Sequence, residues 1–567
     1  MPSIRILPEE LVNKIAAGEV VERPASIVKE LVENSIDAKS TRITIDIQQG
    51  GKKLIRLADN GCGMEREDAI LAFERHATSK LRDEAGLWAI KTMGFRGEAL
   101  PSIASVSRLM MVTSIDAARL GVKVEIEGGR LIGVYDTGAP KGTLVEVKDI
   151  FFNMPARLKF LKAMNTELRH IIEIVTQHAI ANYRIHFTLS HNRKLLFDFP
   201  DSRDIRSRLH QIYGMEFVES LKEIDSKSDH LNVHGFVSLP QVTMADRTHQ
   251  VFFVNGRPVR NATLTHALYE AYRNTIHKDR HPVAFLFIEM EPASVDVNVH
   301  PTKREVAFRD QGSIHDMVVT AIRERIGSLE TVNDKERKDI ISEHFQWRDI
   351  ENGKWWEVES DVAFHSRVME EMQGYLLSTD REDYRFIQID GTFIVAVSHQ
   401  GITIIDQHAA HERILYETLK KAYNFKQITS QSLLIPVVIE LSPAETIILR
   451  EQMGLITSIG IEVEEFSGAS FIIRSVPSVL SGCDPRMLLL DLLTTISKNT
   501  STNLMDAVMA TMACHGAVRA NQPLNSNQMS QLMKDLEKTD MPHTCPHGRP
   551  TIIRFMTEEL KRMFKRR

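Results

Sequence analysis

The spacing of hydrophobic residues predicts alternating helices and strands at the N-terminal end of the chain. In residues 25–37 the apolar side chains recur on one stripe of a helix. In residues 43–47 isoleucine alternates with polar residues, and residues 54–57 form another short apolar run, so both segments are typical of strands. This order of elements predicts an α/β sandwich.

Similar patterns continue along the middle of the chain. Apolar runs at 251–254 and 283–288 predict strands on either side of a helix at 264–273. We therefore expect a second α/β domain at residues 211–327, after a first domain at 1–210. In residues 328–383 charge rises and periodicity weakens, which indicates a charged linker.

The C-terminal part has its own pattern. Strand-like runs return at 393–397 and 402–405, and helical patterns dominate after residue 487. We expect a separate α+β domain at residues 384–567. The fold class as a whole is therefore a multidomain α+β protein.

Composition agrees with several ordinary globular domains. The chain has 567 residues, of which 43% are hydrophobic and 26% charged. Since no apolar run approaches the length of a spanning helix and the N-terminus lacks a signal-peptide pattern, we expect a cytoplasmic protein without a membrane partner. Four widely spaced cysteines favour free thiols or metal ligands over disulfides. The net charge of −5 predicts no general affinity for nucleic acid, so any DNA contact requires local basic patches.

The predicted helix at 25–37 carries polar residues beside its apolar stripe. Glu30, Asn34 and Asp37 are spaced about one helical turn apart, so a carboxylate and a carboxamide point together. Such a pair suits nucleotide hydrolysis, because a carboxylate can take a proton from water and an amide oxygen can bind Mg²⁺. A solvated acidic helix face is the alternative.

Two glycine-containing turns add to this pattern. Asp59, Gly61 and Gly63 follow a predicted strand, where glycine allows close approach to a ligand and Asp59 could accept a hydrogen bond from a base. This segment could equally be a simple turn. A second turn offers backbone amides to phosphate at the start of a predicted helix and consists of Gly94, Phe95, Arg96, Gly97, Glu98, Ala99 and Leu100.

Taken in order, these segments resemble the ATPase superfamily of type II topoisomerases, Hsp90 chaperones, histidine kinases and MutL. The resemblance narrows to the MutL family of DNA mismatch repair in three further stretches, KIAAGEVVERPA at 14–25, RHATSK at 75–80 and FFNMPAR at 151–157. It implies an N-terminal α/β sandwich ATPase, a second α/β domain and a C-terminal dimerisation domain.

The resemblance also implies roles for single residues. Glu30 would be the general base, Asn34 the Mg²⁺ ligand and Asp59 the adenine contact, with Gly61 and Gly63 beside it. Residues 94–100 would form the phosphate-binding part of a lid, and Thr143 would belong to a further nucleotide-binding turn. In the second domain Lys303 would reach the γ-phosphate of ATP, where it would sense nucleotide and assist hydrolysis. An exposed turn is the alternative for Lys303.

By the same likeness, ATP binding would order the lid and switch a homodimer, with slow turnover. The implied partners are DNA and a mismatch-recognition protein of the MutS type, in the cytoplasm and at the nucleoid. Nothing in the C-terminal part suggests the cleavage domain of a topoisomerase. Candidate phosphate contacts, for which a solvated basic face is the alternative, are residues 255–260 with Arg273, Lys278 and Arg280.

Residues 431–436, QSLLIP, are similar to the sliding-clamp peptide of nuclease-bearing MutL proteins. Gln431, Leu434 and Pro436 would dock on a replication clamp in extended form. An ordinary edge strand continuing into residues 437–439 is the alternative.

The C-terminal domain carries a candidate metal site. His408 and Glu412 are four residues apart on one predicted helix face, and cysteines and histidines farther along add donors that suit Zn²⁺ or Mn²⁺. The segments resemble the endonuclease motifs of MutL proteins that nick DNA, which implies that Asp406 and Glu412 are catalytic and Arg549 meets phosphate. The implied metal ligands are Asp406, His408, Glu412, Cys514, Cys545 and His547.

One departure puts nicking in doubt, since the family usually has Lys or Arg where this chain has His515. A lone structural or regulatory zinc is the alternative for this site. In that case the chain would be a non-nicking, ATP-dependent DNA clamp or matchmaker.

Overall fold

The computed structural model describes residues 20–80, 92–94, 97–273, 275–276, 280–296, 305–327, 384–498, 503–517 and 523–565. These residues divide into two compact units. The first unit contains the described residues up to 327 together with 435–456 and 463–474. The second contains the remaining described residues of the C-terminal part.

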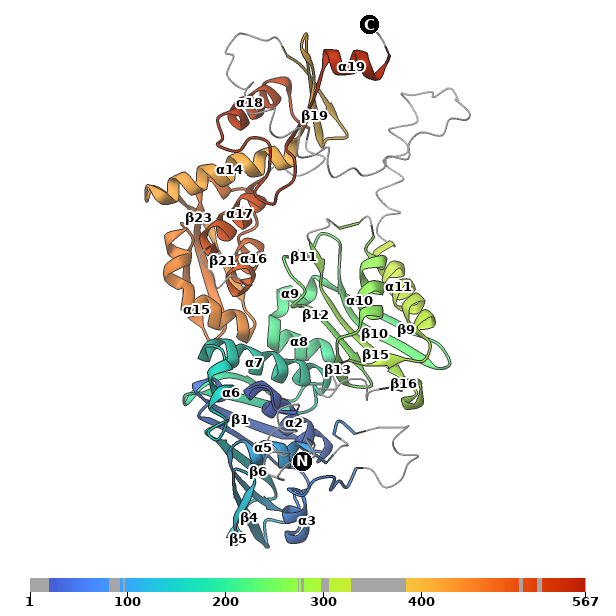
Figure 1. Cartoon of the computed structure of the whole chain (residues 1–567), viewed down its shortest axis with the longest axis vertical. Coiled ribbons are helices and arrows are strands. Elements are labelled where there is room, and N and C mark those ends of the chain that lie inside the picture. The colour runs from blue at the N-terminus through green and yellow to red at the C-terminus, as the bar shows by residue number, and fades with distance from the viewer. Residues whose placement is uncertain are drawn as a thin grey trace, which may run out of the picture. The chain divides into compact units, whose positions relative to one another are not determined.

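An eight-stranded sheet forms the N-terminal layer of the first unit (Figure 1). Its strand order is β5-β4-β3-β6-β2-β1-β7-β8, and every neighbouring pair is antiparallel except β1 and β7. The strands are β1 (Arg42–Gln48), β2 (Leu54–Asp59), β3 (Arg108–Ser114), β4 (Leu120–Glu127), β5 (Arg130–Gly138), β6 (Gly142–Lys148), β7 (His186–His191) and β8 (Lys194–Phe199).

Helices α2 (Pro24–Asp37) and α7 (Met164–Ala181) pack on each other and on this sheet (Figure 1). Pro24 occupies the first turn of α2, where its fixed φ and missing N–H cost nothing. Every second residue of β1 is buried, as the alternation of isoleucines predicted. The predicted α/β sandwich is therefore confirmed. Shorter helical elements are η1 (Gln49–Gly51), α3 (Arg66–Leu71), α5 (Ala99–Ser105) and α6 (Pro155–Phe160).

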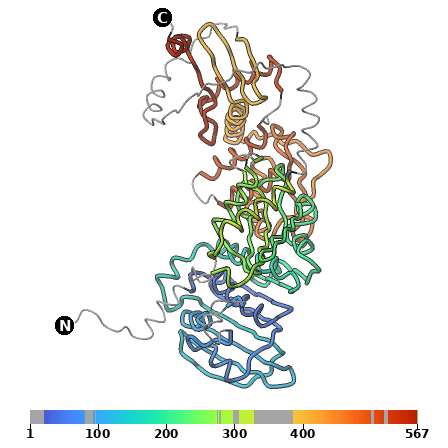
Figure 2. The backbone as a smooth tube through the Cα atoms, turned by 90° about the vertical axis from the view of Figure 1, so that its right-hand side faces the viewer, coloured from blue at the N-terminus to red at the C-terminus, as the bar shows by residue number. Residues whose placement is uncertain are grey.

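The second α/β part has a five-stranded sheet of order β13-β12-β15-β10-β9, drawn in green in Figure 2. Its buried face packs against helices α10 and α11 in one apolar core. The elements are α8 (Ile205–Tyr213), α9 (Met215–Glu219), β9 (Leu221–Lys227), β10 (Leu231–Ser238), β11 (Thr243–Met244), β12 (Gln250–Val254), β13 (Arg257–Val259), α10 (Ala262–Ala271), β14 (His281–Pro282), β15 (Ala284–Met290), η2 (Pro292–Ser294), β16 (Val295–Asp296), β17 (Ala307–Phe308) and α11 (Gln311–Gly327).

Helix α10 begins and ends two residues before the predicted helix at 264–273. The side chain of Asn261 accepts a hydrogen bond from the backbone N–H of Leu264, so this cap sets the start of the helix. The predicted strands at 251–254 and 283–288 correspond to β12 and β15.

A four-stranded antiparallel sheet of order β18-β19-β20-β24 lies in the C-terminal part, beside helices α14 and α18. A three-stranded sheet has the order β21-β23-β22. The elements are β18 (Arg385–Ile389), β19 (Phe393–Ser398), β20 (Gly401–Asp406), α14 (Gln407–Asn424), β21 (Ser430–Glu440), α15 (Pro443–Ser458), β22 (Glu462–Ser467), β23 (Ser470–Pro477), η4 (Ser478–Leu480), α16 (Pro485–Lys498), α17 (Leu504–Gly516), α18 (Ser526–Glu537), β24 (Ile552–Met556) and α19 (Thr557–Met563).

The four-stranded sheet is apolar on both faces. Its inner face packs in a core with α14 and α18, and Ile394 lies in that core. On the outer face the strand register aligns Ile387, Val395, Ile404 and Ile553 in one row across all four strands. The two end members of this row are about half exposed, at 57% and 50%.

None of the helices that the structure describes is both long enough and apolar enough to cross a bilayer.

Candidate nucleotide and metal sites

Helix α2 positions the three polar residues predicted for nucleotide chemistry. Glu30, Asn34 and Asp37 all lie within this helix, one turn apart, as the sequence predicted. The Glu30 side chain is almost buried, and its carboxylate lies 3.9 Å from the ammonium of Lys29. The helix therefore supplies a carboxylate held in a sheltered position, which is what a general base requires.

A lysine from a distant segment joins Asn34 to Asp37. The Lys80 ammonium donates to the Asn34 carboxamide oxygen at 2.8 Å and to the Asp37 carboxylate at 2.6 Å. Both acceptors are oxygens, the ligand type that Mg²⁺ prefers, so the residues present fit a divalent cation. In this arrangement a lysine cation contacts the oxygen predicted to bind the metal.

Asp37 also holds the backbone of the second glycine-containing segment. The amides of Met93 and Gly94 donate to its two carboxylate oxygens at 2.9 and 3.0 Å. The Thr92 hydroxyl in turn donates to the carbonyl of Gly94 at 2.7 Å. Asp37 therefore connects helix α2 with the start of the predicted phosphate-binding run.

The rest of that run is described only in part. A helix starts within this run, as predicted: α5 begins at Ala99, and Leu100 lies in its first turn. Gly97 has a positive φ of 65°, and the Glu98 carboxylate lies 3.6 Å from His76. Phe95, Arg96 and Lys303 lie outside the described residues.

Asp59 is the last residue of strand β2 and both of its oxygens have partners. One accepts from the backbone N–H of Gly61 at 2.8 Å, and the other accepts from the hydroxyl of buried Ser35 at 2.7 Å. Each carboxylate oxygen can accept more than one hydrogen bond, so Asp59 remains able to receive an amino group of a base. Ser35 was not singled out from the sequence, although it follows Asn34 directly.

Two glycines allow backbone segments around Asp59 to meet. A Cβ on Gly63, whose φ is +69°, would lie 2.1 Å from the carbonyl oxygen of Ser114. A Cβ on Gly142, whose φ is +121°, would lie 2.0 Å from the carbonyl oxygen of Asp59. The neighbouring Thr143 hydroxyl lies 3.0 Å from that of Thr113. These close approaches require glycine and bring the turns of β2 and β6 together.

The C-terminal part brings five predicted metal ligands together. His408 and Glu412 lie on α14 with 3.6 Å between their nearest nitrogen and oxygen atoms. Together with Cys514 of α17 they form one group of donors, and Glu412 forms a second group with Cys545 and His547. Within each group all donor atoms lie within 4.8 Å of one another. Imidazole, carboxylate and thiol donors at this spacing fit Zn²⁺, whereas Mn²⁺ would depend mainly on the carboxylate and imidazole donors.

Asp406 lies outside both donor groups. It is the N-cap of α14, and its carboxylate accepts from the backbone N–H of Ala409 at 3.0 Å. Its predicted role as a metal ligand stays a prediction, since a cap residue must turn or share its oxygens to reach an ion.

The donors also perturb one another's protonation. Hydrogen bonds with Cys545 and Glu412 raise the pKa of His547 to about 10. Burial alone would raise the pKa of Glu412, but the hydrogen bond and charge of His547, the charge of His408 and a hydrogen bond from Cys514 together lower it. The site therefore favours an ionised Glu412, which is the form that binds a metal.

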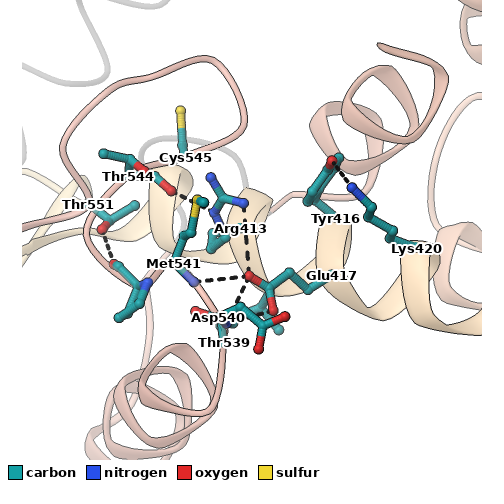
Figure 3. Close-up of polar contacts among 12 residues, drawn as sticks. Arg413, Tyr416, Glu417, Lys420, Thr539, Asp540, Met541, Thr544, Cys545 and Thr551 are labelled. Atoms are coloured by element: carbon teal, nitrogen blue, oxygen red, sulfur yellow. Dashed lines mark hydrogen bonds and ion pairs between the residues drawn. The ribbon is translucent and has the colours of Figure 1, made fainter. Parts of the chain in front are cut away.

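Two buried residues one turn apart on α14 hold the segment that leads to Cys545 (Figure 3). The Arg413 guanidinium donates to the carbonyl of Thr544 at 2.6 Å. The Glu417 carboxylate accepts from the amides of Asp540 and Met541, at 2.8 Å and 3.3 Å for the nearest oxygen of each. These contacts join residues more than 120 positions apart, and the sequence reasoning did not identify either side chain as part of the site.

His515, the departure from the family pattern, pairs with an acid. Its Nε2 lies 2.7 Å from the carboxylate of Asp491, which is 1% exposed. This hydrogen bond connects α17 with α16 and fixes the orientation of the imidazole.

The predicted clamp peptide lies in strand β21, at the edge of the three-stranded sheet. Leu434 is 99% exposed and Ile435 is 77% exposed. The segment is therefore an edge strand, as the alternative proposed, and its aliphatic side chains nevertheless point into solvent.

One arginine of the candidate basic patch in the second part is buried, and two others are exposed. Arg257 is 6% exposed, so it lies in the interior and contributes nothing to a surface patch. Arg280 donates to the hydroxyl of Thr243 at 3.0 Å. Arg260 and Arg273 have side chains that are 73% and 69% exposed, so a phosphate contact by these two stays a prediction. Lys278 lies outside the described residues.

The fold and the nucleotide site define an ATPase domain of the class shared by histidine kinases, DNA gyrase B and Hsp90. Residues 22–126 match the family described as "Histidine kinase-, DNA gyrase B-, and HSP90-like ATPase". Residues 209–327 match "DNA mismatch repair protein, C-terminal domain", and residues 386–524 match "MutL C terminal dimerisation domain".

Relatives that match the whole chain identify a family within this class. The DNA mismatch repair protein MutL of Geotalea uraniireducens (strain Rf4) is 37% identical over 599 residues, and that of Geobacter sulfurreducens is 38% identical over 606 residues; each alignment covers 99% of both chains. A crystal structure of the N-terminal domain of a DNA repair protein matches 56% of this chain and 99% of its own, with 27% identity and a TM-score of 0.50. The chain belongs to the MutL family of DNA mismatch repair proteins, which confirms the family expected from its motifs.

Proposed function

We propose that this chain binds ATP and hydrolyses it slowly, and that the nucleotide switches a homodimer that couples mismatch recognition to strand removal. The ATPase domain would span residues 1–210, followed by the second domain at 211–327, a linker at 328–383 and the C-terminal domain at 384–567. The observation that carries this proposal is that Lys80 contacts both Asn34 and Asp37 of helix α2, within a domain of the ATPase class.

Each residue has a defined task in this proposal. Glu30 accepts a proton from the attacking water, Asn34 holds Mg²⁺ through its carboxamide oxygen and Asp59 accepts a hydrogen bond from the adenine amino group. Bound Mg²⁺ neutralises phosphate charge. Lys303 stays a proposed contact to the γ-phosphate. The backbone around the base and the phosphates comes from Gly61, Gly63, Thr143 and residues 94–100.

Substitution of the proposed base tests this assignment. Glu30→Gln should lower the ATP hydrolysis rate by at least about a hundredfold, the contribution typical of a general base. ATP affinity should change little, because the amide keeps the size of the side chain. Glu67→Gln, on exposed helix α3, is the control and should hydrolyse ATP at the parental rate. Parental turnover by Glu30→Gln would show that another group is the base.

A second proposed activity is metal-dependent nicking of DNA by the C-terminal domain. The supporting observation is that Glu412 belongs to two donor groups, so one carboxylate can serve two ions. Bound ions would activate water and neutralise phosphate charge. In this proposal Glu412 and Asp406 are catalytic ligands, and Arg549 contacts the phosphate. The alternative is a non-nicking clamp or matchmaker with a structural or regulatory zinc.

A plasmid assay separates these alternatives. Purified protein with Mn²⁺ should convert supercoiled plasmid into nicked circles, and both Asp406→Asn and Glu412→Ala should abolish nicking. Glu558→Ala, on the surface of α19, is the control and should nick normally. Intact plasmid with the parental protein, or equal nicking by all variants, would favour the matchmaker.

The outer face of the four-stranded sheet is the proposed homodimer surface. Its row of aliphatic side chains crosses every strand, and exposed apolar surface of this kind is typical of protein interfaces. A second copy of the chain is the proposed occupant. Light scattering should report a monomer mass for the Ile387→Lys, Ile553→Lys double variant, and a dimer mass for Phe425→Lys, which changes an exposed residue elsewhere. A dimer in both would place the interface elsewhere.

The remaining proposed partners are DNA, a mismatch-recognition protein of the MutS type and a sliding clamp. For the clamp, Gln431, Leu434 and Pro436 would fill an apolar pocket from an extended strand. Gln431→Ala with Leu434→Ala should abolish clamp binding without altering the circular dichroism spectrum, and unchanged affinity would end this idea. DNA affinity should fall steeply with salt if phosphate contacts carry it.

A further inference from the structure

A hairpin of the second sheet carries a buried arginine at its tip. Strands β12 and β13 are joined by Asn255 and Gly256, whose φ angles of 47° and 77° match a two-residue turn. The Asn255 side chain accepts from the backbone N–H of Met290 at 2.9 Å, which ties the turn to β15. Arg257 is the first residue of β13, so its backbone is held by a rigid sheet.

The side chain of Arg257 leaves this sheet and binds the ATPase domain. Its Nη2 donates to the carbonyl oxygen of Thr92 at 2.9 Å. A Cβ on the adjacent Gly256 would lie 3.8 Å from the terminal methyl of Met93. The hairpin tip therefore contacts the segment Thr92–Gly94.

The guanidinium is only partly satisfied. Arg257 is 6% exposed, and its Nη1 is buried without a hydrogen-bond partner among the described residues. Burial of a charged group with unused donors is unfavourable. A buried guanidinium of this kind needs a specific partner, and the described residues provide one in the carbonyl of Thr92.

A continuous series of hydrogen bonds leads from Arg257 to the proposed metal ligand. The segment Thr92–Gly94 places the amides of Met93 and Gly94 on the Asp37 carboxylate. Asp37 binds the Lys80 ammonium, which also binds the carboxamide oxygen of Asn34. Each step in this series is 3.0 Å or shorter.

We propose that Arg257 is a positioning residue that couples the second sheet to the nucleotide site by fixing the segment Thr92–Gly94 against Asp37. The inference rests on the proposed ATPase function and extends it to a contact independent of Lys303. Arg257 touches neither substrate nor metal in this role. Arg257 fixes the position of the backbone amides of Met93 and Gly94, which donate to Asp37. Asp37 and Lys80 in turn fix the position of the Asn34 carboxamide oxygen.

Arg257→Met separates positioning from a merely structural role. Methionine keeps the length and apolar contacts of the side chain but removes the donor and the half-satisfied charge, so unfolding temperature should stay the same or rise. KM for ATP should rise about tenfold, within the range typical of coupling between sites, with a smaller change in kcat. A residue needed only for folding would instead lower the unfolding temperature and leave KM unchanged.

Two further variants complete the test on the full chain. Arg257→Lys keeps a donor for Thr92 and should return KM to within about threefold of the parental value. Arg323→Gln, which removes an exposed guanidinium from the backbone carbonyl of Glu270, is the matched control and should leave KM unchanged. Parental KM in Arg257→Met, or no recovery in Arg257→Lys, would overturn the inference. Absence of ATP hydrolysis by the parental protein would instead overturn the proposed function.

Discussion

Removal of the Glu417 carboxylate should weaken both the fold of the C-terminal part and the zinc binding proposed for it. This side chain accepts from two backbone amides, of Asp540 and Met541, and lies 3.9 Å from the guanidinium of Arg413. Arg413 binds the carbonyl of Thr544, directly before the proposed ligand Cys545. Glu417→Ala therefore releases the segment that positions two of the donors.

The size of the effect follows from burial. Hydrogen bonds to a charged group contribute about 1.5–3 kcal/mol each, and breaking a buried ion pair costs about 3–5 kcal/mol. These contributions overlap, so we expect a loss of about 3–5 kcal/mol in the free energy of unfolding. At about 2–4 °C per kcal/mol for a domain of this size, the unfolding temperature should fall by roughly 6–20 °C. Glu417→Gln keeps one acceptor oxygen and should lose less.

Calorimetry of the full chain, with and without Zn²⁺, measures the first effect, and competition with a chelating dye measures the second. We expect zinc affinity to fall at least about tenfold in Glu417→Ala, because the donors of the second group lose their fixed spacing. Thr418→Ala changes the next, exposed residue of the same helix and should behave as the parental protein. A Glu417→Ala protein that melts within 2 °C of the parental and binds zinc equally would refute this account.

Three further predictions concern other parts of the chain. Gly142→Ala should lower the free energy of unfolding, measured with urea, by at least about 1–3 kcal/mol, because the φ of Gly142 is +121° and a Cβ would lie 2.0 Å from the carbonyl oxygen of Asp59. Gly138→Ala is the control, since nothing lies within 4 Å of a Cβ there, and an equal effect of both substitutions would contradict this prediction. Lys80→Met should raise the Mg²⁺ concentration needed for ATP binding by about fivefold, since its ammonium holds the carboxamide oxygen of Asn34 in place; a lower requirement in binding titrations would show that Lys80 competes with the metal. Burial, and to a lesser extent the neighbouring aspartate, raises the pKa of Cys483 to about 11, so its thiolate is scarce at pH 8 and becomes more abundant as the pH rises. Mass spectrometry should therefore find that iodoacetamide labels the exposed Cys62 before Cys483. Equal labelling of the two cysteines at pH 8 would be inconsistent with this pKa.

Elements with strong local patterns could be predicted from the sequence. The helix at 25–37 was correct almost to the residue, because its apolar stripe and initial proline act locally. His408 and Glu412 were placed on one helix face by their spacing alone, and the structure brings them together. The helix at 264–273 was displaced by two residues, because the cap at Asn261 outweighs the hydrophobic pattern at its ends.

Contacts between distant segments could not be predicted. Lys80 and Asn34 are 46 positions apart, and Glu417 and Asp540 are 123 apart, so no spacing rule connects them. The prediction that Arg257 belongs to an exposed basic patch was wrong for a related reason. A strand of three residues gives no local signal of which side chain becomes buried by another part of the chain.

The dispersed origin of the metal donors has a consequence for the kinetics of folding. Glu412 and His547 are 135 positions apart, and the donors come from α14, α17 and a turn before β24. An ion held by them would act as a cross-link, and closing a loop of about a hundred residues removes roughly 4–5 kcal/mol of entropy from the unfolded chain in the simplest model. Because the donors meet only after these elements have packed, capture of the ion would be a late folding step. The ion would therefore chiefly lower the rate of unfolding and change the rate of folding little.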